Sequence, residues 1–382
     1  MATNIKPPGR TIRSAEGYIA FIPDPLPPSL DWTPELVAAL SEADHLLGRL
    51  AGAGGRLPNP HLLIRPFIRR EAVLSSHIEG TQATLGELLA SEAGAAVERS
   101  PDDLREVANY VVALEYGVGR LRKLPLSLRL TREIHKRLMK DVRGNTATPG
   151  EFRRSQNWIG PPGSTPATAS YIPPPPLEMM ECLGAWETFL HDRSLPPLVQ
   201  IALAHSQFEA IHPFLDGNGR VGRLLITLFL VARDLLPSPL LYLSAFFDAT
   251  RRDYYDRLNG VTREGAWGDW LVYFLSGVAR QSEDALGRSE RMMGLLEDWR
   301  KEAAGGPSKV PLHVLDFLAS NPYITVKGAT EKLGVAFTTA QRAIERLEKQ
   351  KVLTQVGEGR RDRVYCAQAL LKILEEPAKL TP

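Results

Sequence analysis

The chain has 382 residues, of which 43% are hydrophobic and 24% are charged, and its formal net charge is +2. This composition is typical of a globular protein with room for two or three domains, and the small net charge gives no global argument for nucleic-acid or membrane binding. Cys182 and Cys366 are too few and too far apart for a disulfide framework, and no segment reads as a signal peptide or a bilayer span. We therefore expect a cytoplasmic protein without a membrane partner.

The N-terminal region begins with a proline-rich stretch. Residues 1–31 predict an extended arm with one short strand at 18–22. Thr33 is followed by a proline, which is the usual order of a helix cap and a first helical residue. The helix that starts there is expected to end at the glycine-rich stretch 51–55.

The next helix is predicted from Pro66 to Gly80, because glycine commonly ends a helix. Ser75 and Glu79 are four residues apart on this helix, so they share one face. Amphipathic helices follow at 84–122 and 126–139.

Residues 146–176 are rich in glycine and proline, begin with a Gly150-Glu-Phe-Arg-Arg segment, and show no helical periodicity. A stretch of this length without helix is usually a functional loop or disordered. The most strand-like part is 167–172. His135, which precedes the loop, is expected to be structural, and the apolar helix at 196–211 is expected to lie at the centre of the fold.

That apolar helix leads into His-Pro-Phe-Leu-Asp-Gly-Asn-Gly-Arg-Val-Gly-Arg, residues 212–223, followed by a buried helix. Gly217 and Gly219 allow a tight turn whose N–H groups can approach a ligand. A glycine turn before a helix N-terminus favours anions, because unpaired N–H groups and the helix dipole act together. Arg220 and Arg223 lie on one helical face and can bind phosphate oxygens.

Two further residues of this segment carry ionisable side chains. Asp216 is suited to Mg²⁺, which is typically held by one or two carboxylates together with phosphate oxygens. His212 has an ordinary pKa of about 6.5 and is the natural general base. The segment therefore predicts a site for a nucleoside triphosphate with its own base.

The C-terminal part has a different pattern, which resembles a winged helix-turn-helix. Helices are expected at 310–319, 326–333 and 337–349, followed by a hairpin between 352 and 366. Arg360, Arg361 and Arg363 in the expected wing make the region basic, which suits a phosphate backbone or an acidic partner surface. DNA binding does not follow from such a fold, and we favour a protein-interaction or structural role.

The segment 212–223 matches without departure the motif of the Fic family, H-x-F-x-D/E-G-N-G-R-x-x-R. The resemblance implies a mainly α protein with an all-α core, which transfers AMP from ATP to a hydroxyl of a target protein. His212 would deprotonate that hydroxyl, Phe214 would anchor the loop, and Asp216 would hold Mg²⁺. Phosphate binding would fall to Gly217, Asn218, Gly219, Arg220 and Arg223.

The segment from Ser75 to Gly80 resembles the inhibitory motif of the same family, S/T-x-x-x-E-G/N. The resemblance implies that Glu79 pairs with Arg223 and occupies the place of the ATP γ-phosphate. A carboxylate on that guanidinium would remove it from phosphate binding. The protein would then be autoinhibited within one chain.

Two further parts of the site are implied by resemblance. The loop at 146–176 would carry a small β-hairpin flap that aligns the target protein by strand addition. Tyr254, Tyr255 and Leu258 would line the adenine pocket, unless they form an aromatic stripe of the core. Thr262 stands near the place where the family often has a polar residue, commonly asparagine.

The resemblance also implies a domain division and a function. The expected units are an N-terminal helical region at 1–122 with the inhibitory helix at about 66–80, a Fic core at 123–300 with the flap at about 146–176 and the motif at 212–223, and a winged-helix-like domain at 307–370. The expected function is an autoinhibited protein adenylyltransferase. The alternatives are removal of AMP by the same site, with Glu79 positioning a water near a metal, and a DNA-binding regulator with a nucleotide-sensing core. A homodimer stays open.

Overall fold

A computed structural model describes residues 8–56, 60–98, 100–142, 148–161, 163–306, 308–357 and 363–378. The protein is 62% helix and 6% strand, which confirms the expected mainly α fold. In chain order the elements are β1 (Gly9–Arg13), β2 (Ile19–Pro23), α1 (Pro34–Arg56), α2 (Pro60–Ile78), α3 (Leu85–Glu92), α4 (Pro101–Arg120), α5 (Leu128–Leu138), α6 (Pro176–Leu190), α7 (Pro197–Ile211), α8 (Asn218–Ala232), α9 (Ser244–Ala249), α10 (Arg251–Glu264), α11 (Trp267–Ala304), α12 (Val310–Ser320), β3 (Tyr323–Thr325), α13 (Val326–Leu333), α14 (Phe337–Lys349), β4 (Thr354–Val356), β5 (Val364–Cys366) and α15 (Gln368–Glu375).

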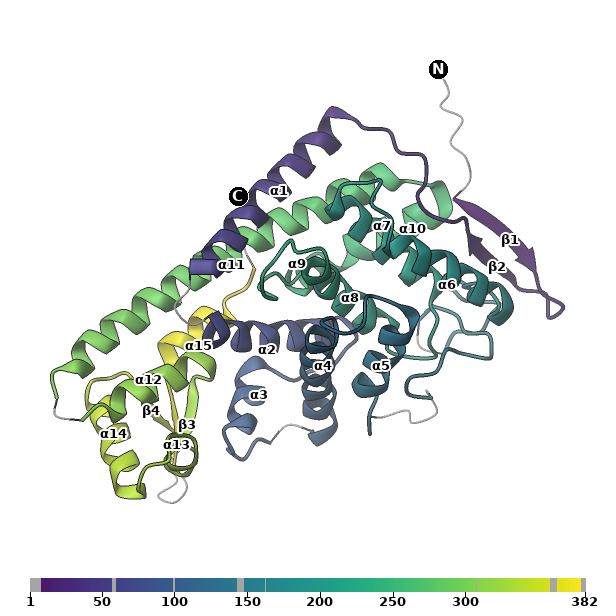
Figure 1. The fold of residues 1–382 in the computed structure, drawn as a ribbon. Coiled ribbons are helices and arrows are strands. Elements are labelled where there is room, and N and C mark those ends of the chain that lie inside the picture. The colour runs from purple at the N-terminus through teal and green to yellow at the C-terminus, as the bar shows by residue number, and fades with distance from the viewer. Residues whose placement is uncertain are drawn as a thin grey trace.

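The helix α7 lies at the centre of the fold, as its apolar sequence predicts (Figure 1). It is buried along almost its whole length and packs against α6, α8, α10 and α11. The helix α8 is also buried almost throughout and contacts α2, α4 and α5. The two helices that flank the motif are therefore held from all sides by the core.

The N-terminal region departs from the sequence expectation in three places. The helix predicted to start at Pro66 is α2, which begins at Pro60 and continues through that proline. The strand predicted at 18–22 is β2, but it pairs antiparallel with β1, which the sequence did not reveal. The expected break at 51–55 is wrong, because α1 continues through these glycines to Arg56. Figure 1 shows α1 lying along α11, and this packing buries Leu47 and Leu50, which outweighs the weak helix propensity of glycine.

A single helix of 38 residues, α11, joins the helices around α7 and α8 to the C-terminal part (Figure 1). It begins against α7 and α9, and it also contacts α12 and α15. Trp270 on its first turn is fully buried and donates a hydrogen bond to the Ala202 carbonyl at 2.9 Å. Trp270 is thus a packing residue.

The C-terminal part contains the predicted helices as α12, α13 and α14, with a three-stranded antiparallel sheet in the order β3-β5-β4. Neither β3 nor α15 was expected from the sequence, and the predicted domain end at 370 falls inside α15. Arg360 and Arg361 lie outside the described residues. The order of elements is compatible with a winged helix, which stays an interpretation.

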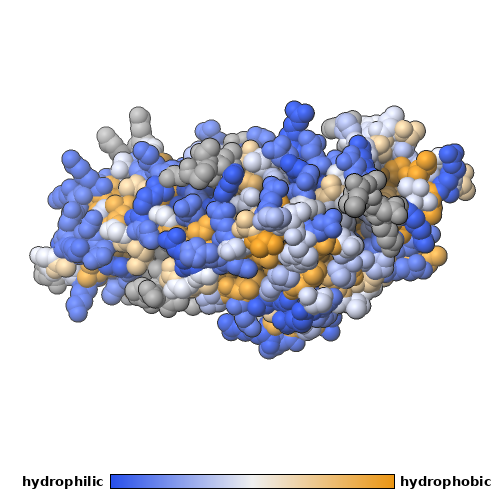
Figure 2. Space-filling model, turned by 90° about the horizontal axis from the view of Figure 1, so that it is seen from above, coloured by the Kyte–Doolittle hydropathy of each residue, from blue (hydrophilic) through white to orange (hydrophobic). Residues whose placement is uncertain are grey.

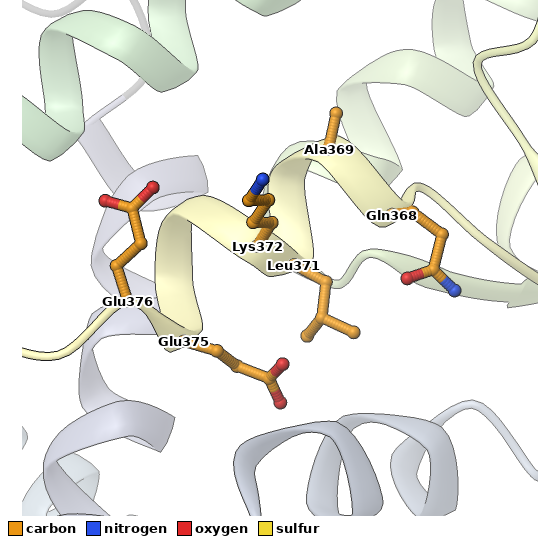
Figure 3. A pocket seen from close by; sticks show the side chains of 6 residues that line it. All are labelled: Gln368, Ala369, Leu371, Lys372, Glu375 and Glu376. Carbon is orange, nitrogen blue, oxygen red and sulfur yellow. The ribbon is translucent and has the colours of Figure 1, made fainter.

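The helix α15 packs back onto α2, α3 and α11. A cleft of about 480 Å³ lies along it, lined by Gln368, Ala369, Leu371, Lys372, Glu375 and Glu376 (Figure 3). Glu375 accepts a hydrogen bond from the Gly86 N–H at 3.0 Å, and Glu376 pairs with Arg291 at 2.8 Å. Its carboxylates therefore dock α15 onto its neighbours, and the cleft lies apart from the motif.

The surface is mostly polar. Figure 2 shows hydrophilic side chains over much of one face, with apolar groups in separate patches. Within the described ranges, the helices that are long enough to cross a membrane are not apolar enough to do so.

Candidate active site

The motif forms a tight connection between two buried helices. The helix α7 ends at Ile211, and His212 caps it in the left-handed conformation with a φ of 49°. Gly217, with a φ of 78°, then caps the start of α8. A Cβ at Gly217 would lie 2.8 Å from the Met139 sulfur, so both the backbone angle and the space require glycine here.

Side-chain hydrogen bonds fix the loop between the two helices. The Asn218 side chain accepts from the Phe214 N–H and donates to the Phe214 carbonyl, both at 2.8 Å. The Gly217 N–H donates to Asp216 Oδ1 at 2.6 Å. The side chain of Asn218 thus holds the loop and is not available to a ligand. Its backbone N–H lies in the first turn of α8, has no intrahelical acceptor, and is suited to a phosphate.

His135 braces the same loop from α5. Its Nδ1 accepts a hydrogen bond from the Gly150 N–H at 2.8 Å, so Nε2 carries the proton and donates to the Asp216 carbonyl at 3.1 Å. Its ring stacks on Phe214, with ring centroids 3.7 Å apart, and Phe214 is fully buried. Burial lowers the pKa of His135 to about 4, which keeps it neutral. The expected structural role of His135 fits these contacts.

Two residues of the loop after Gly150 also hold the motif, and the sequence analysis missed both. Arg153 is buried, its Nε donates to the His212 carbonyl at 3.0 Å, and its Nη2 donates to the Pro174 carbonyl. Asn157 donates to the Phe214 carbonyl at 2.8 Å. The Gly150-Glu-Phe-Arg-Arg segment at the head of the loop was a visible signal for Arg153, whereas Asn157 had none.

The expected strand at 167–172 is wrong. The described part of the loop contains one isolated antiparallel bridge, between Ile159 and Tyr171, and no strand. Prolines at 161, 166 and 173–176 lack the N–H donors that a hairpin ladder needs. The described part of this loop is therefore joined to itself by one β-bridge and forms no regular hairpin.

His212 is held as a neutral imidazole with one ring nitrogen available. Its Nδ1 lies 3.3 Å from the Glu209 carbonyl and donates to it, which leaves the Nε2 lone pair free to accept a proton. Burial lowers the pKa of His212 to about 4, so it is neutral at pH 7. Glu209, one turn earlier, was not singled out from the sequence; burial raises the pKa of its carboxyl to about 7.

Asp216 remains partly open, with 56% of its side chain exposed. Mg²⁺ prefers one or two carboxylates and keeps water and phosphate oxygens as its other ligands, so a single accessible carboxylate at a phosphate site fits it. Among the described residues, no group of three or more acidic, His or Cys side chains forms a metal cage. Asp216 therefore fits an ion whose other ligands would come from water or phosphate oxygens.

Glu79 and Arg223 meet in the structure as the resemblance implied. Arg223 is buried, and its Nη2 donates to Glu79 Oε1 at 2.6 Å and to the Ser75 carbonyl at 2.8 Å, while Nε donates to Ser75 Oγ at 2.9 Å. Burial alone would raise the pKa of Glu79 and lower that of Arg223. Their mutual attraction prevails, lowering the pKa of Glu79 and raising that of Arg223. His77 ties the same end of α2 to Asp248 at 2.9 Å.

Arg220, the first arginine of the motif, is also buried and already paired. Its Nη1 donates to Glu106 Oε2 at 3.2 Å, and its Nη2 lies 3.9 Å from Asp216 Oδ1. The sequence gave no signal for Glu106, one acidic residue of an amphipathic helix. Both arginines are therefore paired with a carboxylate from another part of the chain, Arg220 with Glu106 and Arg223 with Glu79.

Two family descriptions match consecutive parts of this chain: the N-terminal part of the Fic/DOC family over residues 37–119, and the Fic/DOC family over residues 125–230. The chain belongs to the Fic/DOC family. Proteins named protein adenylyltransferase Fic from Drosophila virilis and Drosophila melanogaster are 33% and 32% identical to it over 160 residues. The match covers 40% of this chain and 31% and 30% of theirs, so the chain spans about a third of the length of the curated relatives it matches.

Solved structures share the Fic fold. A Fic family protein from Desulfovibrio desulfuricans G20 has a TM-score of 0.60 at 20% identity, over 90% of this chain and 98% of that one. Fic-1 from C. elegans (aa134–508) has a TM-score of 0.53 at 22% identity, over 67% of this chain and 74% of that one. At these identities the likeness concerns the fold alone.

The tyrosines expected in the adenine pocket of this Fic protein differ in exposure. Tyr254 is 1% exposed, its ring stacks on Phe247, and its hydroxyl lies 2.9 Å from His205 Nε2. The burial of Tyr254 favours the alternative, an aromatic stripe of the core. Tyr255 is 39% exposed and Leu258 is half-buried, so contact of these two with adenine stays a prediction.

We expect the Fic fold to lose stability on acidification, because three imidazoles are held in neutral form: His135 and His205 are buried, and His212 is half-buried. Burial lowers the pKa of His135, His205 and His212 to about 4, 3 and 4. Below pH 6.5 the unfolded chain binds protons at these groups and the folded chain does not, so stability falls as the pH falls. Glu209, with its raised pKa, acts in the opposite sense.

The net loss between pH 7 and pH 5 is expected to be about 3 kcal/mol, at about 1.4 kcal/mol per unit of pKa shift. Urea unfolding at the two pH values measures it. An equal free energy of unfolding at both would show that these histidines are not held neutral.

Proposed function

We propose that this Fic protein is a protein adenylyltransferase, which moves AMP from ATP to the hydroxyl of a Ser, Thr or Tyr residue in another protein. The observation that carries the proposal is the position of the neutral, half-buried His212 beside the N-terminus of α8, where phosphate oxygens are expected to bind. The relatives named protein adenylyltransferase Fic support the same chemistry.

In the proposed reaction, His212 accepts the proton of the target hydroxyl at Nε2, because Nδ1 already donates to the Glu209 carbonyl. The hydroxyl oxygen forms a bond to the α-phosphorus of ATP, and the bond to the β-phosphate oxygen breaks, so pyrophosphate leaves. Arg220, Arg223 and the N–H groups of the first turn of α8 stabilise the charge on the phosphates. Mg²⁺, when held by Asp216, would neutralise further charge on the leaving pyrophosphate.

We propose that Glu79 inhibits this reaction within the same chain. Its carboxylate occupies Nη2 of Arg223, the group expected to bind the end of the phosphate tail. It also adds a negative charge where the γ-phosphate would lie. ATP would thus bind weakly or in the wrong orientation until the last turn of α2 moves.

The test uses the Glu79→Gly variant with Mg²⁺ and ATP labelled at either the α- or the γ-phosphate. We expect protein-bound label from α-labelled ATP and none from γ-labelled ATP, on this protein itself or on an added lysate protein. Label from the γ position would identify a kinase instead. Label from neither would overturn ATP as the substrate.

Removal of AMP from a modified protein is the second candidate. The Glu79 side chain pairs with Arg223 and yet stays 36% exposed, so its carboxylate is open to a water molecule beside the site. A protein labelled by Glu79→Gly and then incubated with wild type would lose its label if removal is the cellular reaction. Stable label would leave transfer as the function.

We infer that the C-terminal part is a winged-helix unit with a structural or protein-interaction role. Its helices α12 and α15 pack against α2, the helix that ends just before Glu79, which supports this role. DNA binding is not favoured, and a cytoplasmic location stays our expectation.

A further inference from the structure

Glu106 on α4 joins two parts of the site that are distant in the sequence. Its Oε2 accepts one hydrogen bond from Arg220 Nη1 at 3.2 Å and a second from Thr81 Oγ1, also at 3.2 Å. Arg220 belongs to the phosphate-binding motif, whereas Thr81 follows the inhibitory helix by three residues. One carboxylate oxygen is therefore shared between the catalytic and the inhibitory segments.

Arg220 depends on this carboxylate. The Arg220 side chain is 5% exposed, so its charge has lost nearly all of its water. Its other contacts are weaker: the Met139 sulfur is 3.6 Å away, Asp216 Oδ1 is 3.9 Å away, and the buried Nε has no acceptor among the residues that the structure describes. A desolvated guanidinium needs a close carboxylate, and Glu106 supplies the hydrogen-bonded one.

Thr81 is bonded to the last turn of α2, so the two are expected to move together. Its N–H donates to the Ser76 carbonyl at 3.1 Å, and Gly80 before it has a φ of 99°, which turns the chain back onto the helix end. Thr81 is buried, so its hydroxyl has little access to water. If Glu79 leaves Arg223 by a movement of this turn, Thr81 moves with it.

We propose that Glu106 is a positioning residue, which holds Arg220 in place to bind phosphates. Through Thr81, phosphate binding by Arg220 then depends on the position of the inhibitory turn, residues 76–81. The inference rests on the proposed function. While Glu79 is bound to Arg223, Oε2 accepts from both Arg220 and Thr81, so the position of the carboxylate is set by both donors. When the turn moves away, Thr81 releases Oε2, and the carboxylate is committed to Arg220.

The test is a double-mutant cycle in the full chain, on the Glu79→Gly background, with α,β-methylene ATP and Mg²⁺ as the calorimetric probe. Glu106→Gln keeps the shape of the side chain and removes its charge, and we expect it to weaken binding of the probe about tenfold. On an Arg220→Ala background the same substitution is expected to cause no further loss. Glu115→Gln is the matched control, since Glu115 lies on α4 but pairs with Arg69.

A kinetic comparison adds a readout that a merely structural role would not move. Glu106→Gln is expected to raise KM for ATP more than it lowers kcat, while the thermal midpoint stays near that of Glu115→Gln. Thr81→Val, made with Glu79 intact, is expected to raise basal labelling severalfold, because the inhibitory turn loses one tie.

Binding of the probe within twofold of the parent in Glu106→Gln, or an equal loss with and without Arg220, would overturn the positioning role. Basal labelling unchanged in Thr81→Val would overturn the coupling to the inhibitory turn. The binding cycle needs no transfer of AMP. If the binding cycle shows coupling between Glu106 and Arg220 but the protein transfers no label, the proposed function is refuted and the positioning role of Glu106 is kept.

Discussion

Replacing Glu79 by glycine is expected to raise transfer of α-phosphate label from ATP about ten- to a hundredfold over wild type. The substitution removes the carboxylate that lies 2.6 Å from Arg223 Nη2, and a hydrogen bond to a charged group is worth about 1.5–3 kcal/mol. Arg223 keeps its bonds to Ser75, so the freed Nη2 stays in place for a phosphate. Initial rates of label incorporation at subsaturating ATP measure the effect.

Glu79→Gln serves as the graded control for this prediction. It keeps the length of the side chain and loses the charge, so we expect an intermediate rate. A rate in wild type equal to that in Glu79→Gly would show that the pair with Arg223 is only structural. Faster transfer in Glu79→Gln than in Glu79→Gly would contradict the charge argument in particular.

Adding His212→Ala to Glu79→Gly is expected to lower the rate of transfer by about 10²–10⁴-fold, the usual contribution of a positioned general base. His212 is a neutral imidazole near the N-terminus of α8, and its Nε2 is free to accept a proton because Nδ1 donates to the Glu209 carbonyl. Binding of ATP is expected to change little, since Arg220, Arg223 and the α8 N–H groups remain. Single-turnover labelling and calorimetry separate the two effects.

His191→Ala is the matched control for this loss, because His191 is an exposed histidine at the end of α6. It is expected to transfer label at the parental rate. Persistent transfer in the His212→Ala variant would mean that another group takes the proton. A loss confined to ATP affinity would make His212 a binding residue.

The sequence by itself determined the local chemistry of this protein. The turn between α7 and α8 needs glycine at 217, the helix N-terminus predicts an anion site, and the predicted base His212 and the predicted Mg²⁺ ligand Asp216 belong to the same short segment. Helix α13 appeared at its predicted residues, because a Thr325 cap and a left-handed Gly334 are local signals, and α14 did so because its apolar residues recur at helical spacing. Neighbours along the chain set all of these features.

Only the tertiary structure decided what surrounds that site. Glu106 reaches Arg220 across 114 positions of sequence, and Arg153 reaches the His212 carbonyl across 59. Tertiary packing also buries Tyr254 and leaves Tyr255 partly exposed. Packing against α11 likewise lets α1 stay helical through its glycines. Such choices depend on packing and hydrogen bonds between distant segments, which leave no periodic pattern in the sequence, so they become visible only once the chain is folded.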